Sequence, residues 1–335
     1  MKYENQYSPF CDFVYYESSV TPGIQLAMRV LKPEKPSYIK VLAHGWHGTA
    51  RPFIYLDEPF YGEMNMPYNE YAEHLVIEAN MRGRWYSDGH PDCNGLELFD
   101  CIDAVSYARE HYADYLIDDK VVFLEGASGG GGNVYSLLGK FPDFFAAATA
   151  ACGMSDYALW YEQDEEGIYR DEMDVWIGCA PWENSEAYKA RGGLHLIENL
   201  QTPLFITHGE MDLSVTSEHA RRYVERAATL GKDGLVNYFE VKGVGCGPVG
   251  GHWSDISDDD LYHIIDMSKQ NMRRHTCEVE LPRSGTLKVG GYVVTKHFSV
   301  MLDSMDKTAV LEYDLDQDRF HIDFEQPCRY EIKTY

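Results

Sequence analysis

The apolar positions of this 335-residue chain fall into short runs, most of them separated by segments in which apolar residues recur at helical spacing. The predicted strands are residues 12–17, 24–31, 38–43, 75–79, 121–124, 144–151, 203–207 and 235–241. The predicted helices are residues 96–111, 133–140, 218–228 and 258–274. Strands that alternate with helices predict an α/β fold, a doubly wound and mostly parallel sheet with helices on both faces. The first two strands, joined by a turn at Pro22-Gly23, supply its antiparallel edge.

Residues 155–200 interrupt this alternation with a long aromatic and acidic segment that follows the sixth predicted strand. Its aromatic residues include Trp160, Tyr161, Tyr169, Trp176 and Trp182, beside an acidic run at 162–174. Loops of this length inside a compact domain usually have a function or a structure of their own. We expect an insertion that acts as a lid, with Trp160 and Tyr161 lining the substrate pocket. The alternative is a surface excursion that packs its own aromatic side chains.

The last segment, residues 276–335, is rich in Val, Tyr, Thr and Phe and has no helical period. This composition predicts a small β-rich appendage behind a larger α/β domain at 1–275. We expect the appendage to form an extra packing layer or the contact of a homodimer.

A Gly-x-Ser-x-Gly turn follows the apolar run at 121–124, spans Gly126 to Gly130 and has Ser128 at its centre. Between a strand and a helix, such a turn forces the serine into a strained bend, with its hydroxyl clear of the sheet and open to a base. The flanking glycines are needed where backbone segments approach closely. Ser128 is therefore the candidate nucleophile, and a glycine-rich loop without chemistry is the alternative.

A serine hydroxyl is a weak nucleophile at neutral pH and needs a base that a third group orients. Asp212 lies just past the strand at 203–207, and His252 follows the next strand and a glycine-rich loop. The chain order Ser128, Asp212, His252 is the order used by hydrolases with this turn. His208 is a rival base, but it stands at the end of a strand, and we expect it to brace the loop that carries Asp212.

Acyl transfer also needs N–H donors aimed at the developing oxyanion. The amide of Gly129, directly after the nucleophile, is one predicted donor. The amide of Trp46, in the loop His44-Gly45-Trp46 that ends the third strand, is the other. This chemistry requires no metal and no organic cofactor.

Five motifs together resemble the α/β-hydrolase superfamily. They are His44-Gly45-Trp46, the stretch from Met81 to Gly89, Gly126-Ala127-Ser128-Gly129-Gly130, His208-Gly209-Glu210-Met211-Asp212 and Gly251-His252. Within the superfamily, residues 10–275 look most like the prolyl oligopeptidase catalytic domain and its acetyl xylan esterase and dienelactone hydrolase relatives. The resemblance implies the same triad and the same oxyanion donors.

Three departures from the family pattern bear on function. Trp253 directly follows the predicted base, where relatives commonly have glycine, and is expected to narrow the substrate pocket. Asn80 stands where relatives often have Asp, two residues before Arg82, which calls the usual salt bridge of that loop into question. About 45 residues precede the oxyanion loop, too few for the β-propeller that gates prolyl oligopeptidases. Ester hydrolysis is therefore favoured over size-selective cleavage of peptides.

Composition and charge limit the classes of partner that the chain is expected to bind. A formal net charge of −25 disfavours binding to nucleic acid and to anionic membranes. The charge either keeps the protein soluble or biases the site against anionic substrates. The eight cysteines are scattered without metal-type spacing, so free thiols are expected, although Cys277 and Cys328 flank the appendage and could pair. Lacking an apolar leader and any segment of transmembrane length, the chain is expected to be cytoplasmic.

We therefore expect a serine hydrolase that cleaves a carboxylic ester of a small or medium acyl group through an acyl-enzyme intermediate. Two alternatives stay open. The first is a serine peptidase that acts on short peptides, with an acidic patch such as 162–174 receiving the N-terminal amine. The second is a ligand-binding protein that keeps the fold without turnover.

Overall fold

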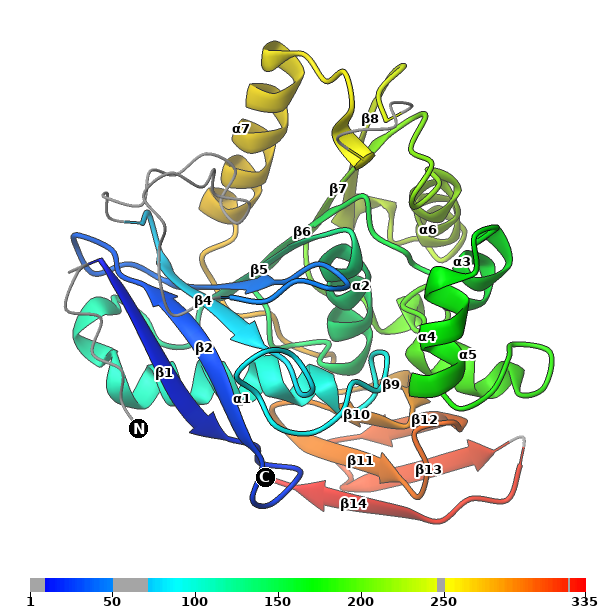
Figure 1. Cartoon of the computed structure of the whole chain (residues 1–335). Coiled ribbons are helices and arrows are strands. Elements are labelled where there is room, and N and C mark those ends of the chain that lie inside the picture. The colour runs from blue at the N-terminus through cyan, green and yellow to red at the C-terminus, as the bar shows by residue number, and fades with distance from the viewer. Residues whose placement is uncertain (1–9, 51–71, 246–250, 325) are drawn as a thin grey trace.

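The computed structural model describes residues 10–50, 72–245, 251–324 and 326–335. Within these residues the main sheet has the strand order β1-β2-β4-β3-β5-β6-β7-β8 (Figure 1). The strands are β1 (Cys11–Glu17), β2 (Gln25–Leu31), β3 (Ile39–Ala43), β4 (Leu75–Asn80), β5 (Val122–Ala127), β6 (Ala147–Ala151), β7 (Leu204–Gly209) and β8 (Val236–Val241). β2 pairs antiparallel with β1 and β4, and the other neighbouring pairs are parallel. The predicted α/β sheet with an antiparallel edge is confirmed.

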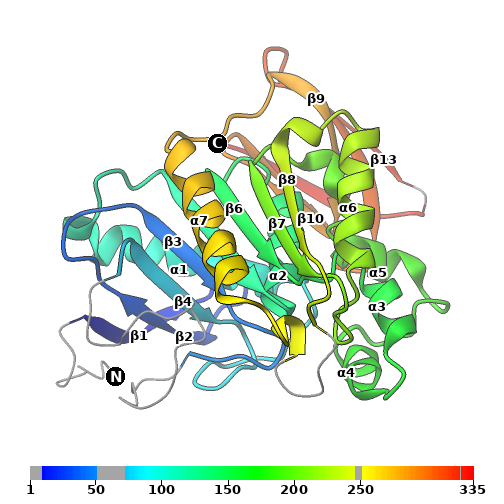
Figure 2. The ribbon, with the colours of Figure 1, turned by 90° about the horizontal axis from the view of Figure 1, so that it is seen from above.

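Helices cover both faces of this sheet. They are α1 (Glu97–His111), α2 (Gly129–Lys140), α6 (Glu218–Thr229) and α7 (Asp258–Arg274). α7 lies on one face, and the other three lie on the opposite face (Figure 2). Because successive side chains of a strand point to opposite faces, Val122 and Leu124 of β5 join the core beneath α1 and α2, whereas Phe123 packs with Met272 of α7. Strands buried on both faces explain the continuous apolar runs of the sequence.

The insertion at 155–200 follows β6, as the sequence predicts, and the structure shows that it is helical. It contains α3 (Tyr157–Gln163), α4 (Ile168–Trp176) and α5 (Ser185–Arg191). The Asp156 carboxylate accepts the N–H groups of Ala158 and Leu159 at the start of α3, and such caps fix where a helix begins. Buried side chains of these three helices form a second cluster that also takes in Trp46 and Val215, whereas Ile197 and Leu200 join the core of the main domain. The insertion therefore packs its own aromatic residues and contacts the main domain as well.

The C-terminal segment forms a second, antiparallel sheet with the order β13-β12-β9-β10-β11-β14 (Figure 1). Its strands are β9 (Ser284–Gly290), β10 (Tyr292–Val294), β11 (Phe298–Leu302), β12 (Thr308–Asp314), β13 (Arg319–Phe324) and β14 (Tyr330–Thr334). The predicted β-rich appendage is confirmed, while its boundary at 275/276 and its role in a homodimer stay predictions. The seven cysteines among the described residues are free, Cys277 and Cys328 included; Cys246 lies outside the described residues.

One aromatic residue of this second sheet belongs to the core of the main domain. The Tyr292 ring packs against Phe99 and Phe141, with ring centroids 4.5 and 5.7 Å apart, and its hydroxyl donates to the Gly95 carbonyl (2.9 Å). The fully buried Lys140 ammonium, at the end of α2, lies 4.3 Å from the centre of the Tyr292 ring and donates a hydrogen bond to the Gly290 carbonyl. The appendage thus seals the far end of α2.

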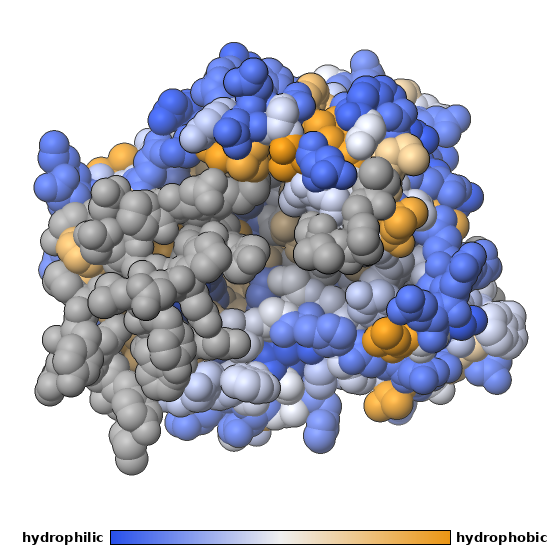
Figure 3. All heavy atoms as spheres, turned by 45° about the horizontal axis from the view of Figure 1, so that its top comes forward, coloured by the Kyte–Doolittle hydropathy of each residue, from blue (hydrophilic) through white to orange (hydrophobic). Residues whose placement is uncertain are grey.

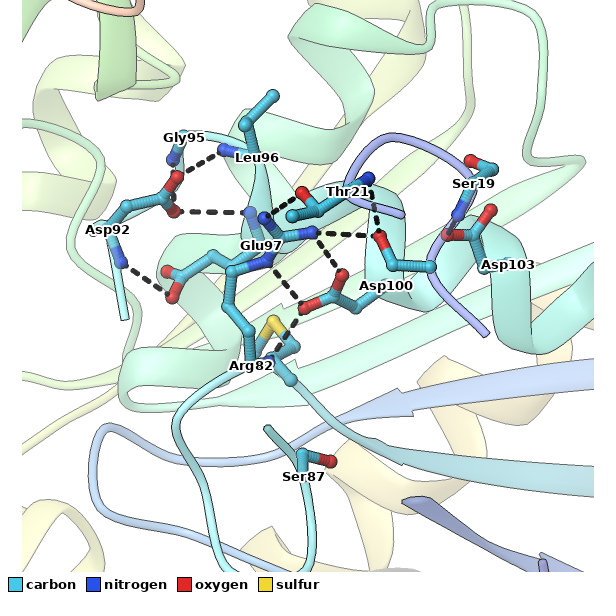
Figure 4. A network of polar contacts seen from close by, with 12 residues as sticks. Ser19, Thr21, Arg82, Ser87, Asp92, Gly95, Leu96, Glu97, Asp100 and Asp103 are labelled. Carbon is cyan, nitrogen blue, oxygen red and sulfur yellow. Dashed lines mark hydrogen bonds and ion pairs between the residues drawn. The ribbon is translucent and has the colours of Figure 1, made fainter. Parts of the chain in front are cut away.

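Two buried polar groups hold the loop that follows β4. Arg82 pairs with Asp100 of α1, with 2.6 Å between Nη2 and Oδ1, and its backbone N–H donates to the same carboxylate (2.7 Å; Figure 4). The Asn80 amide instead bonds the N–H and the carbonyl of Ala50 (2.6 and 2.8 Å) and donates to the Trp85 carbonyl (3.0 Å). The loop therefore keeps an arginine salt bridge, with its acid supplied by α1 instead of by position 80.

Asp92 and Glu97 cap the start of α1 reciprocally (Figure 4). The Asp92 carboxylate accepts the N–H groups of Gly95, Leu96 and Glu97 (3.2, 2.6 and 3.1 Å). The Glu97 carboxylate accepts those of Asp92 and Asn94 (3.3 and 2.7 Å). Both carboxylates are thereby used by the backbone of their own turn.

The face shown in Figure 3 is largely hydrophilic, with apolar side chains in small groups, in keeping with the strong negative charge of the chain. Among the described residues, none of the helices combines the length and the apolar character needed to span a bilayer.

The buried Lys140 gives stability a predictable pH dependence. Burial, and secondarily the charge of Arg191, lowers the pKa of the Lys140 ammonium from 10.5 to about 7. Between these values the unfolded chain binds a proton that the native state lacks, so this group's contribution to stability rises with pH. The difference in free energy of unfolding, wild type minus Lys140→Met, should increase above pH 7 by about 1.4 kcal/mol per pH unit in denaturant titrations. Lys120→Met, at an exposed lysine, controls for the loss of one charge, and parallel pH profiles for wild type and Lys140→Met would contradict the prediction.

Candidate active site

Ser128 stands between β5 and α2 in a strained backbone conformation, with φ 57° and ψ −123°. A positive φ is unfavourable for a side chain with a Cβ, so the surrounding packing has to impose it. A Cβ on Gly126 would lie 2.3 Å from the Gly130 carbonyl oxygen, and a Cβ on Gly130 would lie 2.1 Å from the Ala43 carbonyl oxygen. Glycine is therefore required on both sides of the serine, as the turn motif predicts.

Parallel pairing brings the loops of the site to one edge of the sheet. Ala127 of β5 pairs with Ala151 of β6, which pairs with Thr207 of β7. The Ser128 N–H also donates to the Ala151 carbonyl (2.9 Å). The residues that follow these strands consequently emerge together, and the loop after β7 carries Asp212. This is the edge at which open α/β sheets place their functional loops.

Asp212 and His252 are in direct contact. His252 lies in a short 3₁₀ turn after β8 (Gly251–Trp253), and its Nδ1 is 2.6 Å from Asp212 Oδ2. The other oxygen, Oδ1, accepts the N–H groups of Ser214 and Val215 (2.9 and 3.1 Å). An acid held in this way fixes the tautomer of the imidazole and leaves Nε2 free to exchange protons. Residues 246–250 of the glycine-rich loop before His252 lie outside the described residues.

His208 also contacts the Asp212 carboxylate, and its side chain is shielded from solvent. Its Nε2 lies 3.3 Å from Asp212 Oδ2 and 2.8 Å from the Val215 carbonyl oxygen, and its side chain is fully buried. These contacts agree with the expected bracing of the Asp212 loop. Burial disfavours ionisation of Asp212, but hydrogen bonds from His208 and His252 outweigh it and hold the pKa of this carboxyl well below its usual range.

The described residues show no hydrogen bond between the Ser128 hydroxyl and the His252 ring. In unliganded enzymes this bond is often long and tightens only when substrate binds. The structure therefore brings the predicted acid and base together, and the role of Ser128 as the nucleophile stays a prediction.

The two predicted oxyanion donors lie against each other. A Cβ on Gly129 would be 2.3 Å from the backbone nitrogen of Trp46 and 2.6 Å from its Cα. The loop after β3 thus touches the first residue of α2, where unpaired N–H groups and the helix dipole favour negative charge. Such an arrangement can hold an oxyanion beside Ser128, which is the role predicted for these two amides.

Sequence reasoning missed the residue that joins the insertion to the oxyanion loop. Glu172 of α4 accepts from Trp46 Nε1 (2.5 Å) and bonds His47 Nε2 (2.8 Å). The Trp46 ring also packs on Trp176, one helical turn further along α4, with ring centroids 4.9 Å apart. The one sequence signal is the spacing of four residues, which places Glu172 and Trp176 on the same face of a helix.

The three predicted pocket residues lie in different surroundings. Trp160 adjoins the site, because its ring packs 4.8 Å from the Trp46 ring and its Nε1 donates to the Ser214 carbonyl (3.0 Å). Tyr161 is buried within the insertion and donates to Asp174 (3.1 Å). Trp253 packs in a cluster between β8 and α7. The pocket roles of all three, and the lid role of the insertion, stay predictions.

One group of potential metal ligands occurs in the described part of the chain, and it overlaps the acid–base pair. Ligand atoms of Cys152, Asp212 and His252 lie within 4.8 Å of one another. Burial, and then the charge of Asp212, raises the pKa of the Cys152 thiol well above 9.0, which opposes the thiolate that a metal would need. We assign no metal to these residues.

The sheet order, the strained serine turn and the hydrogen-bonded pair of Asp212 and His252 together define an α/β-hydrolase, and by its chemistry a serine hydrolase. A sequence profile described as the prolyl oligopeptidase family matches residues 71–247, more than half of the chain. The chain belongs to the prolyl oligopeptidase family. The matched segment contains Ser128 and Asp212 and ends before His252.

Individual relatives are distant. The dipeptidyl-peptidase 5 of Porphyromonas gingivalis is 27% identical over 169 residues, 47% of this chain and 24% of that protein. An uncharacterized peptidase, YtmA, of Bacillus subtilis is 25% identical over 163 residues, 47% of this chain and 60% of that protein. The solved acylaminoacyl peptidase of Pyrococcus horikoshii superposes with a TM-score of 0.61 at 19% identity, covering 81% of this chain and 42% of its own. This chain thus spans less than two thirds of each relative, and the structural match speaks for the fold alone.

The contact of Gly129 with Trp46 can be tested by adding one methyl group. Gly129→Ala would push the oxyanion loop away from the start of α2, because its Cβ would overlap the Trp46 backbone. We expect kcat for p-nitrophenyl acetate to fall about 10²- to 10³-fold, the usual cost of losing one oxyanion donor. Gly234→Ala, whose Cβ would meet nothing within 4 Å, is the matched control. Undiminished kcat in a folded Gly129→Ala protein would show that this contact is not part of the catalytic geometry.

Proposed function

We propose that this chain is a serine peptidase that cleaves short peptides, with Ser128 as nucleophile, His252 as base and Asp212 as the acid that orients it. The observation that carries the proposal is the 2.6 Å hydrogen bond between His252 and Asp212 at the sheet edge where Ser128 occupies its strained turn. Membership of the prolyl oligopeptidase family supports peptide bonds as the substrate class. So do the names of the relatives, a dipeptidyl-peptidase and an acylaminoacyl peptidase.

The reaction follows from the roles of these groups. Ser128 Oγ attacks the carbonyl carbon of the peptide bond while His252 Nε2 takes the hydroxyl proton, and the amides of Trp46 and Gly129 hold the oxyanion. The C–N bond breaks as His252 returns the proton to the leaving amine. Water then attacks the acyl-enzyme by the same route and frees Ser128. Asp212 stabilises the imidazolium at each step, because hydrogen bonds keep the buried carboxylate ionised.

The acidic run of the insertion supplies a carboxylate near this centre. Glu172 is the member of the run that reaches the oxyanion loop, where it contacts Trp46 and His47. In the proposal, this negative charge attracts the N-terminal amine of a short peptide. A free amine should therefore favour cleavage over a blocked one.

Ester hydrolysis, the function favoured by the sequence, uses the same machinery with an easier leaving group. A serine peptidase also cleaves activated esters, because an alkoxide or phenolate needs less protonation than an amine. Turnover of p-nitrophenyl esters is thus expected under both functions. Only amide substrates separate them.

The test compares anilides and p-nitrophenyl esters that share the same aminoacyl or dipeptidyl group, with and without N-acetylation. We expect anilide cleavage that prefers the free amine and that falls by roughly 10⁴-fold or more in Ser128→Ala, without loss of the fold by circular dichroism. Ester turnover with intact anilides and peptides would favour the ester hydrolase. Folded wild-type protein that a fluorophosphonate does not label at Ser128 would favour a ligand-binding protein without turnover.

A further inference from the structure

Two arginines stand on either side of Gly83 in the loop after β4, and their surroundings differ. Arg82 is buried and paired with Asp100. Among the described residues, the Arg84 guanidinium has no ion pair and no hydrogen bond, and its Nε is a buried donor without a partner. Its recorded contact is with the Trp176 ring, 5.0 Å from Cζ to the ring centroid. The chain has 54 acidic and 29 basic residues, so an unpaired arginine is conspicuous here.

Arg84 lies close to the oxyanion loop. Trp176, over which its guanidinium stands, packs on Trp46 with ring centroids 4.9 Å apart and 32° between the planes. The Trp46 backbone in turn meets Gly129. An independent sign comes from His44, in the same loop: desolvation, and then the charge of Arg84, lowers its pKa to about 4. A cation therefore stands next to the loop that would bind the reacting carbonyl group.

The acids of this region have other partners. The Glu97 carboxylate accepts two N–H groups of its own turn, and burial, followed by the charge of Asp92, raises its pKa to about 7. Glu172 is engaged by Trp46 and His47. Among the described side chains, none is therefore a direct counterion for the positive charge of Arg84.

We propose that Arg84 determines specificity by binding a carboxylate of the substrate, either the C-terminal carboxylate of a short peptide or an acidic side chain near the scissile bond. The inference rests on the peptidase function proposed above. A guanidinium presents a planar fork of donors that matches a carboxylate, and stacking on an indole holds that fork in place. The net charge of −25 by itself would repel an anionic substrate, and the positive charge of Arg84 offsets this repulsion locally.

The test uses peptides that differ in one charge. One pair has a C-terminal carboxylate or a C-terminal amide, and a second pair has Glu or Gln beside the scissile bond. We expect the wild type to favour one carboxylate member by about 10- to 100-fold in kcat/KM, the usual effect of a charge-assisted hydrogen bond, with the difference in KM. The pair that shows the preference identifies which carboxylate is bound.

Arg84→Met keeps an unbranched side chain over Trp176 and removes the charge. It should abolish the preference and leave kcat/KM for the neutral peptides within about threefold, while Arg84→Lys should restore part of the preference, because a lysine retains the charge without the fork. Arg319→Met, at an exposed arginine of the C-terminal sheet, controls for net charge. Equal kcat/KM for charged and neutral peptides in the wild type would overturn the proposal, and so would an equal loss for all substrates in Arg84→Met.

A separate pair of substrates distinguishes this inference from the peptidase proposal. p-Nitrophenyl hemisuccinate and its methyl ester carry the same reacting bond and differ only in a distal carboxylate. If peptides stay intact but the wild type prefers the hemisuccinate and Arg84→Met does not, the peptidase proposal fails and the role of Arg84 stands. If peptides are cleaved without any preference for a carboxylate, the role of Arg84 fails and the peptidase proposal stands.

Discussion

The site depends on keeping one buried carboxylate ionised. Removing a charge from water is costly unless hydrogen bonds replace the lost hydration. Asp212 accepts hydrogen bonds from two backbone N–H groups and two imidazoles. One of these imidazoles, that of His208, is fully buried and also bonds the Val215 carbonyl of the same loop. The acid is thus organised before any substrate arrives, and the side chain of His252, unlike that of His208, also reaches toward solvent.

The sequence predicts those parts of the fold that local patterns encode. Apolar runs such as 203–207 mark strands buried on both faces, and each of these strands is present. The serine turn is equally local, because Gly126 and Gly130 lie where no side chain would fit. The pairing of Asp212 with His252 can be inferred indirectly from the predicted strands, because the loops that follow parallel strands lie at the same edge of a sheet.

What the sequence leaves open consists of contacts between distant segments. Nothing in the local pattern assigns Asp100 to Arg82, or brings Glu172 to the oxyanion loop, because these partners meet only once helices have packed on the sheet. No local pattern specifies either that His252 faces the acid while the indole of Trp253, the next residue, packs toward α7. The choice between ester and peptide is harder still, because a Ser-His-Asp constellation serves both reactions and the discriminating contacts lie outside it.

The twelve residues of α2 run from the strained turn at Ser128 to a part of the core that the C-terminal sheet helps to form. At the serine end the helix begins in a backbone conformation that packing has to enforce, and at the other end Lys140 and the ring of Tyr292 share a dry contact. Proteolytic loss of the segment from β9 onward would expose Lys140, Phe99 and Phe141 to solvent. The helix would then fray from its carboxyl end toward its strained start. A nick far from Ser128 would then reach its turn through α2, and the C-terminal sheet would be as necessary for the shape of that turn as the loops packed beside it.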